Sequence, residues 1–155
     1  MPQSPDFDRE AAHRYFSVEC FNRTWDLIEK PKRTSEDNRK MVLLSLTSLW
    51  HWTQRSDCTS MNLSIGYWQV SRVYALIGQF ENARMYGQLC LKASQGEGVL
   101  PFYLGYAYEA LARAEMVAGN REKMADYLGQ AFQVVEQVKD PEEKKMLQEG
   151  LSTIQ

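Results

Sequence analysis

Cysteine is scarce in this chain of 155 residues, and the few cysteines do not fit a covalent or metal-bound scaffold. Cys20, Cys58 and Cys90 are odd in number, lie far apart and include no CxxC pair. Disulfide frameworks and structural zinc sites use paired cysteines at close, regular spacings. The sequence therefore excludes both as the basis of the fold, and it favours a reducing cytoplasm as the compartment.

Long apolar runs and an excess of charge are missing as well. The most apolar stretch, MVLLSLTSLW from Met41, has about half the length that a membrane-spanning helix needs. The first residues, MPQSPDFDRE, have neither the basic nor the apolar part of a secretory signal. The formal net charge is -2, with no cluster of lysine and arginine to hold a phosphate backbone. We therefore expect neither a membrane nor nucleic acid among the partners.

Residues typical of catalysis are also few. Histidine occurs only as His13 and His51, and no HExxH, GxSxG, Walker or GxGxxG motif is present. Cys58 follows His51 in a predicted loop, but closeness in sequence does not supply a nucleophile with a base and an orienting group. The sequence predicts no catalytic residue, no metal and no cofactor.

Strand signals are nearly absent, because apolar residues recur at spacings of three and four and no Asn-Gly or Asp-Gly turn is present. The predicted fold class is all-α, in a single domain of residues 1–155. Thr34 with Asp37, and Asp140 before Pro141, are typical starts of helices. Breakers divide the chain into about seven helices, near residues 8–30, 34–55, 62–77, 80–94, 102–118, 121–138 and from 140 onward.

Two segments of the chain repeat each other at an offset of 41 residues. GQFENARMYGQLCL begins at Gly78, and GNREKMADYLGQAF begins at Gly119. Each follows a helical segment, so the pattern of helix, glycine turn and second helix occurs twice. The matched pairs are Tyr67 and Tyr108, Arg72 and Arg113, Gly78 and Gly119, Glu81 and Glu122, and Tyr86 and Tyr127.

With these residues the chain resembles the tetratricopeptide repeat, a helical hairpin of about 34 residues with an early aromatic residue, small residues where its helices cross and glycine at the turn. The likeness covers residues 64–97 and 105–138, beside a divergent first hairpin in 1–60 and a capping helix in 140–155. It implies a right-handed α-α superhelix of about three hairpins plus the cap. GYWQVSRVYALIG and YLGYAYEALARAEMVAG also resemble a group of small bacterial repeat proteins, a likeness that carries no chemistry.

The resemblance further implies that the first helix of each repeat lines a concave face. Its inward positions correspond to Ile65, Trp68, Arg72 and Ala75 in one repeat and to Tyr106, Glu109, Arg113 and Met116 in the other. The planar guanidinium group of arginine offers several N–H donors. Beside rigid aromatic rings, such groups are suited to bind an acidic peptide segment or a small anion. The alternative is structural, with Glu109 pairing with Arg113 on its own helix and Arg72 pairing with Glu109 between repeats.

SLWHWTQR provides a second candidate site, at His51 and Trp52. Adjacent residues of a helix point about 100° apart, so Trp50, His51 and Trp52 do not all face the same core. At least one of them is expected to meet a partner, a ligand or a neighbouring loop. The alternative is that a tryptophan covers the gap between hairpins while His51 caps the helix or is exposed.

Three functions follow from these expectations. The first is a non-enzymatic module that binds a partner protein or peptide segment at Trp68, Arg72, Tyr106, Glu109 and Arg113. The second is a sensor or enzyme for an anionic metabolite, with a pocket lined by Trp68, Arg72, Glu109 and Arg113, and the third is a homodimer that associates through its apolar end faces. The residues expected to be substantially buried are Leu44, Leu46, Leu49, Val70, Tyr74, Leu89, Leu111 and Phe132.

Overall fold

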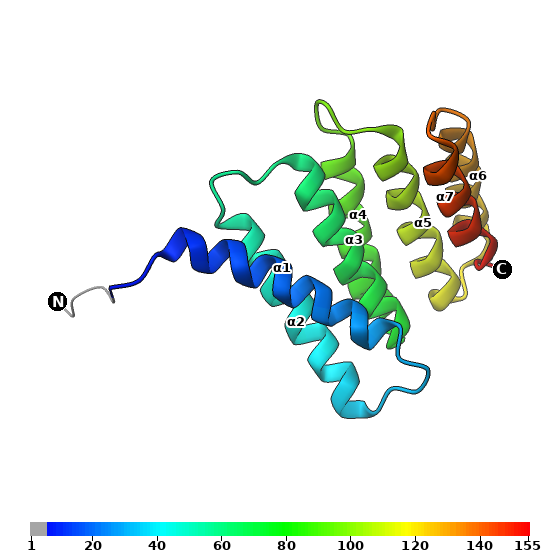
Figure 1. Cartoon of the computed structure of the whole chain (residues 1–155). Helices are drawn as coiled ribbons and strands as arrows, with labels where there is room; N and C mark the ends of the chain where they lie inside the picture. The colour runs from blue at the N-terminus through cyan, green and yellow to red at the C-terminus, as the bar shows by residue number, and fades with distance from the viewer. Residues whose placement is uncertain (1–5) are drawn as a thin grey trace.

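The computed structural model describes residues 6–155, and these residues form seven α-helices and no strand (Figure 1). The all-α class predicted from the sequence is confirmed. In chain order the helices are α1 (Arg9–Ile28), α2 (Ser35–Thr53), α3 (Ser60–Leu76), α4 (Phe80–Ser94), α5 (Pro101–Ala118), α6 (Arg121–Val135) and α7 (Pro141–Ser152).

Side-chain caps mark where five of the described helices begin, α2, α3 and α7 among them. Thr34 accepts a hydrogen bond from the amide of Asp37, and the Asp37 carboxylate accepts one from the amide of Thr34, as the capping box in the sequence predicts. Thr59 and Asn62 form a second capping box at the start of α3. Asp140 accepts from two amides of the first turn of α7. Local sequence therefore determines these starts.

Gly78 and Gly119 end α3 and α5 in the same way. Both have a left-handed backbone, with φ of 78° and 76°, a conformation that glycine adopts without steric cost. The amide after each glycine closes the turn on the carbonyl five residues earlier. These bonds join Gln79 N to Tyr74 O and Asn120 N to Glu115 O, each at 2.9 Å.

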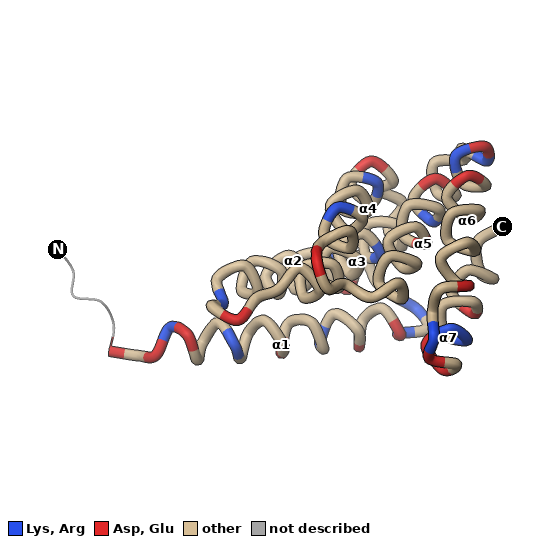
Figure 2. The backbone as a smooth tube through the Cα atoms, turned by 90° about the horizontal axis from the view of Figure 1, so that it is seen from above, with Lys and Arg blue, Asp and Glu red and all other residues tan. Residues whose placement is uncertain are grey.

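Consecutive helices pair as hairpins, α1 with α2, α3 with α4 and α5 with α6 (Figure 1). The hairpins follow one another through contacts of α2 with α3, α4 with α5 and α3 with α5, and α7 packs on α5 and α6. Seen from above, α1 and α7 flank the side on which α3 and α5 lie (Figure 2). We call this side, bordered by α1, α3, α5 and α7, the groove.

The centre of the molecule is α5, in which residues 109–115 are all buried. Small side chains allow its neighbours to approach closely, and Ala83, Ala112 and Ala131 have no exposed surface. At Gly105 a Cβ atom would overlap the side chain of Leu147 on α7. Glycine at this position therefore allows α7 to dock against α5.

The residues predicted to be buried on α2, α3 and α5 are buried or half-buried. The two predicted on α4 and α6 are exposed. Leu49, Val70 and Leu111 are buried, while Leu44, Leu46 and Tyr74 are half-buried. Leu89 and Phe132 are instead 36% and 50% exposed. Each is adjacent in sequence to a fully buried small residue, Cys90 or Ala131, and adjacent residues of a helix point about 100° apart. The narrow buried stripes of α4 and α6 thus leave both large side chains outside.

Within residues 6–155, no helix combines the length and the apolarity needed to cross a membrane.

Candidate functional site

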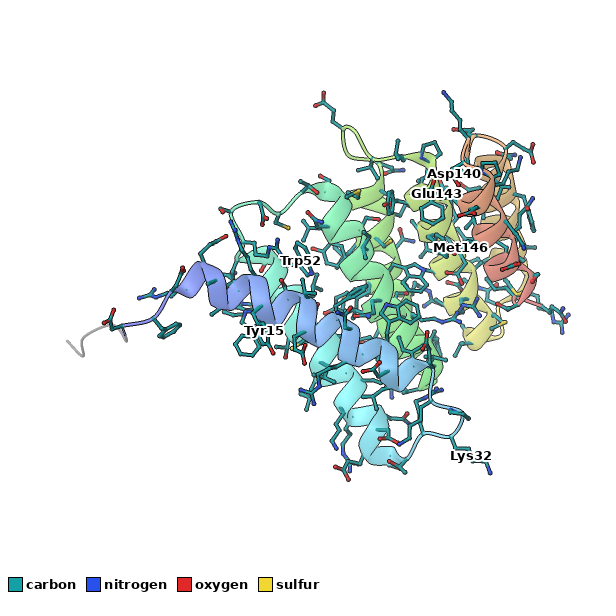
Figure 3. All side chains as sticks on the ribbon, in the orientation of Figure 1. Tyr15, Lys32, Trp52, Asp140, Glu143 and Met146 are labelled. Carbon is teal, nitrogen blue, oxygen red and sulfur yellow. The ribbon has the colours of Figure 1, made fainter. Side chains whose placement is uncertain are left out.

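An aromatic cavity of about 340 Å³ opens in the groove. Its walls come from helices far apart in the sequence: α1, α3, α5 and α7. Met146 of α7 lies at its edge and is 55% exposed (Figure 3). The lining residues are Phe21, Trp25, Ser64, Ile65, Trp68, Phe102, Tyr103, Tyr106 and Met146.

Ring contacts hold the aromatic side chains of this cavity in place. Trp25 stacks on Trp68 with 5.6 Å between ring centroids and 23° between planes. Tyr106 meets Trp68 edge-on at 5.6 Å, and Phe102 meets Tyr106 edge-on at 5.0 Å. Such pairs restrain one another's rotamers, so the cavity presents a rigid aromatic surface.

Glu109 lies behind this surface and is 2% exposed. Its Oε2 accepts a hydrogen bond of 2.8 Å from the Trp68 indole. Its Oε1 accepts from Nε and Nη2 of Arg113, at 2.8 and 2.6 Å. Nη2 of Arg113 also donates to the Gly150 carbonyl at 3.2 Å and to the Thr153 hydroxyl at 2.7 Å. Nε and Nη2 of Arg113 are therefore used within the protein, and the residue ties α5 to the end of α7.

Arg72 has a different environment from its repeat equivalent Arg113. Its Nη1 lies 3.6 Å from Oε1 of Glu109, an ion pair without a hydrogen bond, and Nη1 has no hydrogen-bond partner within the described chain. Burial lowers the pKa of Arg72, and the positive charge of Arg113 lowers it further. Arg72 thus has a buried N–H group, at Nη1, that forms no hydrogen bond.

Tyr106 joins the cavity to the charged residues. Burial raises the pKa of its hydroxyl to about 12, an effect that the charge of Glu109 increases and that of Arg72 reduces. The phenol therefore stays protonated at physiological pH.

The structure brings together five of the predicted site residues, Trp68, Arg72, Tyr106, Glu109 and Arg113. The structural alternative is observed at the same time, since Glu109 pairs with Arg113 on its own helix and with Arg72 across the repeats. Only Trp68 and Tyr106 of the five line the cavity.

The other two predicted residues point to different surroundings. Trp52 lines a smaller cavity of about 230 Å³, which shares Phe21 and Ile65 with the aromatic cavity, and it lies where α2 meets α1 and α3 (Figure 3). The Arg55 guanidinium covers the Trp52 ring at 3.9 Å. His51 instead packs on α1, where its Nδ1 lies 2.8 Å from Nδ1 of His13.

The remaining aromatic of SLWHWTQR is exposed. Trp50 has 55% of its surface accessible and contacts the rings of His13 and His51. As expected, the three consecutive residues do not all face the same core: Trp50 and His51 both contact His13, and Trp52 lines the smaller cavity.

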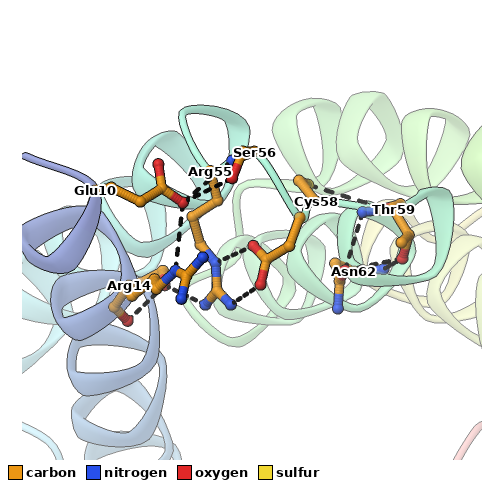
Figure 4. A network of polar contacts seen from close by, with 9 residues as sticks. Glu10, Arg14, Arg55, Ser56, Cys58, Thr59 and Asn62 are labelled. Atoms are coloured by element: carbon orange, nitrogen blue, oxygen red, sulfur yellow. Dashed lines mark hydrogen bonds and ion pairs between the residues drawn. The ribbon is translucent and has the colours of Figure 1, made fainter.

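A polar network fastens the loop after α2 to the first turns of α1 (Figure 4). Arg55 holds Asp57 by two hydrogen bonds of 2.8 Å and reaches Ser17 of α1 at 3.0 Å. Glu10 accepts from the Ser56 hydroxyl at 3.0 Å. The hydrogen bonds from Arg55 lower the pKa of Asp57 to about 2. This network orients the first hairpin, and the sequence pattern did not reveal it.

The Cys58 and His51 pair lacks the features of a catalytic dyad. Burial raises the pKa of the Cys58 thiol, which opposes formation of a thiolate. The hydrogen-bonding partner of His51 is His13. In residues 6–155, no group of three or more His, Cys, Asp and Glu side chains is placed to hold a metal ion.

Several residues that line the cavity were not found from the sequence: Phe21, Trp25, Phe102 and Met146. The repeat pattern does not extend into α1, so nothing in it places Phe21 and Trp25 beside α3. Their spacing of four residues on one helix was the available signal. Met146 lines the cavity from α7, which lies outside the two segments that repeat each other in the sequence.

The fold and the site define an all-α protein of packed helical hairpins with an aromatic cavity on one side. Comparison with known proteins identifies no relative, since no family model, no curated protein and no solved structure matches the chain.

Proposed function

We propose that this chain is a tetratricopeptide-repeat-like stack that acts as a non-enzymatic recognition module. Residues 64–97 and 105–138 are its two repeats, residues 1–60 form a divergent hairpin, and α7 is the cap. Support comes from the equal glycine turns after α3 and α5, and from Arg72 and Arg113, which converge on one carboxylate.

The aromatic cavity is the observation that carries this proposal. Interfaces concentrate their binding energy in a few rigid aromatic and arginine side chains at the centre of the contact. Here Trp25, Trp68 and Tyr106 are held by one another and remain accessible through a cavity of about 340 Å³. A large apolar side chain from a partner protein would fill this space, with the rest of its segment lying along the groove.

The proposal is tested by blocking the mouth of the cavity. Met146→Trp introduces a large ring at an exposed lining position, whereas Met85→Trp makes the same change on α4, where the methionine is 50% exposed and outside the groove. Peptides selected from a random displayed library on the unaltered protein are expected to bind Met146→Trp about tenfold more weakly. They should bind Met85→Trp unchanged. Equal binding to both variants would show that the groove is not the recognition surface.

A small aromatic molecule is the second candidate occupant, because the cavity volume lies at the lower end of the range for ligand pockets. Arg72, Glu109 and Arg113 do not line this cavity. A ligand that binds only the folded protein raises its melting temperature, so a thermal-shift screen of aromatic metabolites separates this function from peptide binding. Homodimer formation stays a prediction, which light scattering tests.

A further inference from the structure

The groove contains a second feature, one helical turn beyond the aromatic cavity, and this inference rests on the function proposed above. α1 approaches α3 at an angle, toward the C-terminal ends of both helices (Figure 1). Val18 and Asn62 line one cavity together, Phe21 accepts a hydrogen bond from Gln69, and Trp25 stacks on Trp68. The end of α1 and the residues that follow it therefore lie beside the end of α3 (Figure 1).

Arg33 occupies this position in the loop after α1. Its Nη1 donates to the carbonyls of Ile28 and Lys30, at 2.9 and 3.4 Å, which fixes the guanidinium against the end of α1. Its Nε is buried and has no hydrogen-bond partner within the described chain. Nη1 of Arg72 also lacks a hydrogen-bond partner within the described chain, although it lies 3.6 Å from Oε1 of Glu109. Each of these two guanidinium groups thus has a buried N–H group that forms no hydrogen bond. A buried donor without a hydrogen bond destabilises the protein unless an acceptor is supplied.

The charge balance points to the nature of that acceptor. Arg33, Arg72 and Arg113 lie close enough for the charges of Arg113 and Arg33 to act on Arg72. Glu109 is the only carboxylate with which these three arginines form an ion pair in residues 6–155, and Arg113 binds it most closely. A planar guanidinium matches a carboxylate in both charge and geometry. The edge of the groove at Arg33 and Arg72 is therefore complementary to an acidic group.

The distance from this edge to the cavity restricts the ligand further. Trp68 and Arg72 are four residues apart on α3, a rise of about 6 Å along the helix. In an extended peptide, side chains two residues apart lie on the same side and are separated by about 6.6 Å. A peptide that lies along the groove can therefore place one side chain in the cavity. The side chain two residues away, on the same side of the peptide, then lies beside Arg72.

We propose that the groove recognises an extended peptide segment in which a bulky apolar residue and an acidic residue are separated by one position. The apolar side chain enters the aromatic cavity, and the carboxylate pairs with Arg72 and Arg33. The pairing is assigned to Arg72 and Arg33 rather than to Arg113, because Nε and Nη2 of Arg113 already donate to Glu109, Gly150 and Thr153.

The test uses short fluorescent peptides, capped at both ends, that contain Phe-Ser-Glu or the reverse order Glu-Ser-Phe. Matched peptides carry glutamine for glutamate, glutamate directly next to phenylalanine, or alanine for phenylalanine. Binding is measured to the unaltered protein, to Arg72→Gln, to Arg33→Gln and to the control Arg39→Gln, an exposed position on α2. Circular dichroism establishes that each variant is folded, and Arg33→Gln decides the outcome if Arg72→Gln does not fold.

We expect at least one order of the spaced glutamate peptide to bind about tenfold more tightly than its glutamine form. This advantage should disappear in Arg72→Gln and in Arg33→Gln and persist in Arg39→Gln. If glutamate and glutamine peptides bind equally while alanine for phenylalanine abolishes binding, the acidic preference is refuted and the recognition function stands. If no peptide depends on its phenylalanine or is affected by Met146→Trp, both proposals fail.

Discussion

At the scale of single residues, the site depends on Glu109. This carboxylate is 2% exposed and accepts hydrogen bonds from Trp68 and Arg113 while pairing with Arg72. A buried ion pair adds little net stability when it is intact, because desolvation offsets much of the attraction. Its removal is costly, since the arginines would remain buried without a counter-charge. Glu109 is therefore the buried counter-charge of Arg113 and Arg72.

Replacing Glu109 with glutamine is expected to reduce the free energy of unfolding by about 3 kcal/mol or more. The shape of the side chain is kept, but Arg113 and Arg72 lose their negative partner. Urea unfolding followed by circular dichroism measures the change. Glu149→Gln is the control, because its side chain is 68% exposed and its partner Lys145 lies 3.9 Å away. A Glu109→Gln loss as small as that of the control would mean that the arginine charges are compensated elsewhere.

At the scale of helices, small residues decide how the hairpins approach one another. Ala112 on α5 has no exposed surface. Its repeat equivalent Ser71 is also buried and donates a hydrogen bond of 2.8 Å to the Ala83 carbonyl on α4. The two positions therefore mark the crossings of α3 with α4 and of α5 with its neighbours.

Arginine at position 112 should unfold or severely loosen the protein, with a loss of more than about 3 kcal/mol, because the crossing has no volume for the side chain and no partner for its charge. Thermal melting measures this loss. Ala125→Arg makes the same exchange at an exposed position of α6 and should leave the melting temperature nearly unchanged. Equal melting of the two variants would place the helix crossing elsewhere.

At the scale of the whole molecule, α7 completes the stack. Its residues Leu147 and Leu151 join a buried cluster with Ala131, Val135 and Val138. Its last turn receives Arg113 at Gly150 and Thr153, while Met146 remains at the groove. The same helix thus covers the apolar end of the stack and borders the cavity.

Two glycine substitutions test this docking. Alanine at Gly105 would overlap Leu147, so we expect Gly105→Ala to displace α7 and to destabilise the protein by about 1–3 kcal/mol. At Gly129, an exposed position within α6, a Cβ atom would meet nothing within 4 Å. Gly129→Ala should therefore stabilise the protein by about 1 kcal/mol through helix propensity. Chemical denaturation of both variants measures the difference, and a stabilised Gly105→Ala would show that α7 does not depend on this close contact.

The sequence by itself determined the features that depend on neighbours along the chain. Apolar spacing predicted the helices, Thr34 and Asp140 predicted where two of them start, and Gly78 and Gly119 predicted the turns. These features follow from backbone hydrogen bonds and torsion angles within a few residues of one another. The sequence also named Trp68, Arg72, Tyr106, Glu109 and Arg113 together, and these side chains do contact one another, while their role in binding stays a prediction.

Only the tertiary structure decided what that grouping can do. Stacking of Trp25 on Trp68 and the action of the Arg33 charge on Arg72 depend on where the end of α1 approaches α3, which no local pattern encodes. The exposure of Leu89 and Phe132 likewise depends on how narrow a stripe the neighbouring hairpins cover. Contacts between distant segments are set by the packing of the whole molecule, so the cavity and the unused arginine donors became visible only once the helices were assembled.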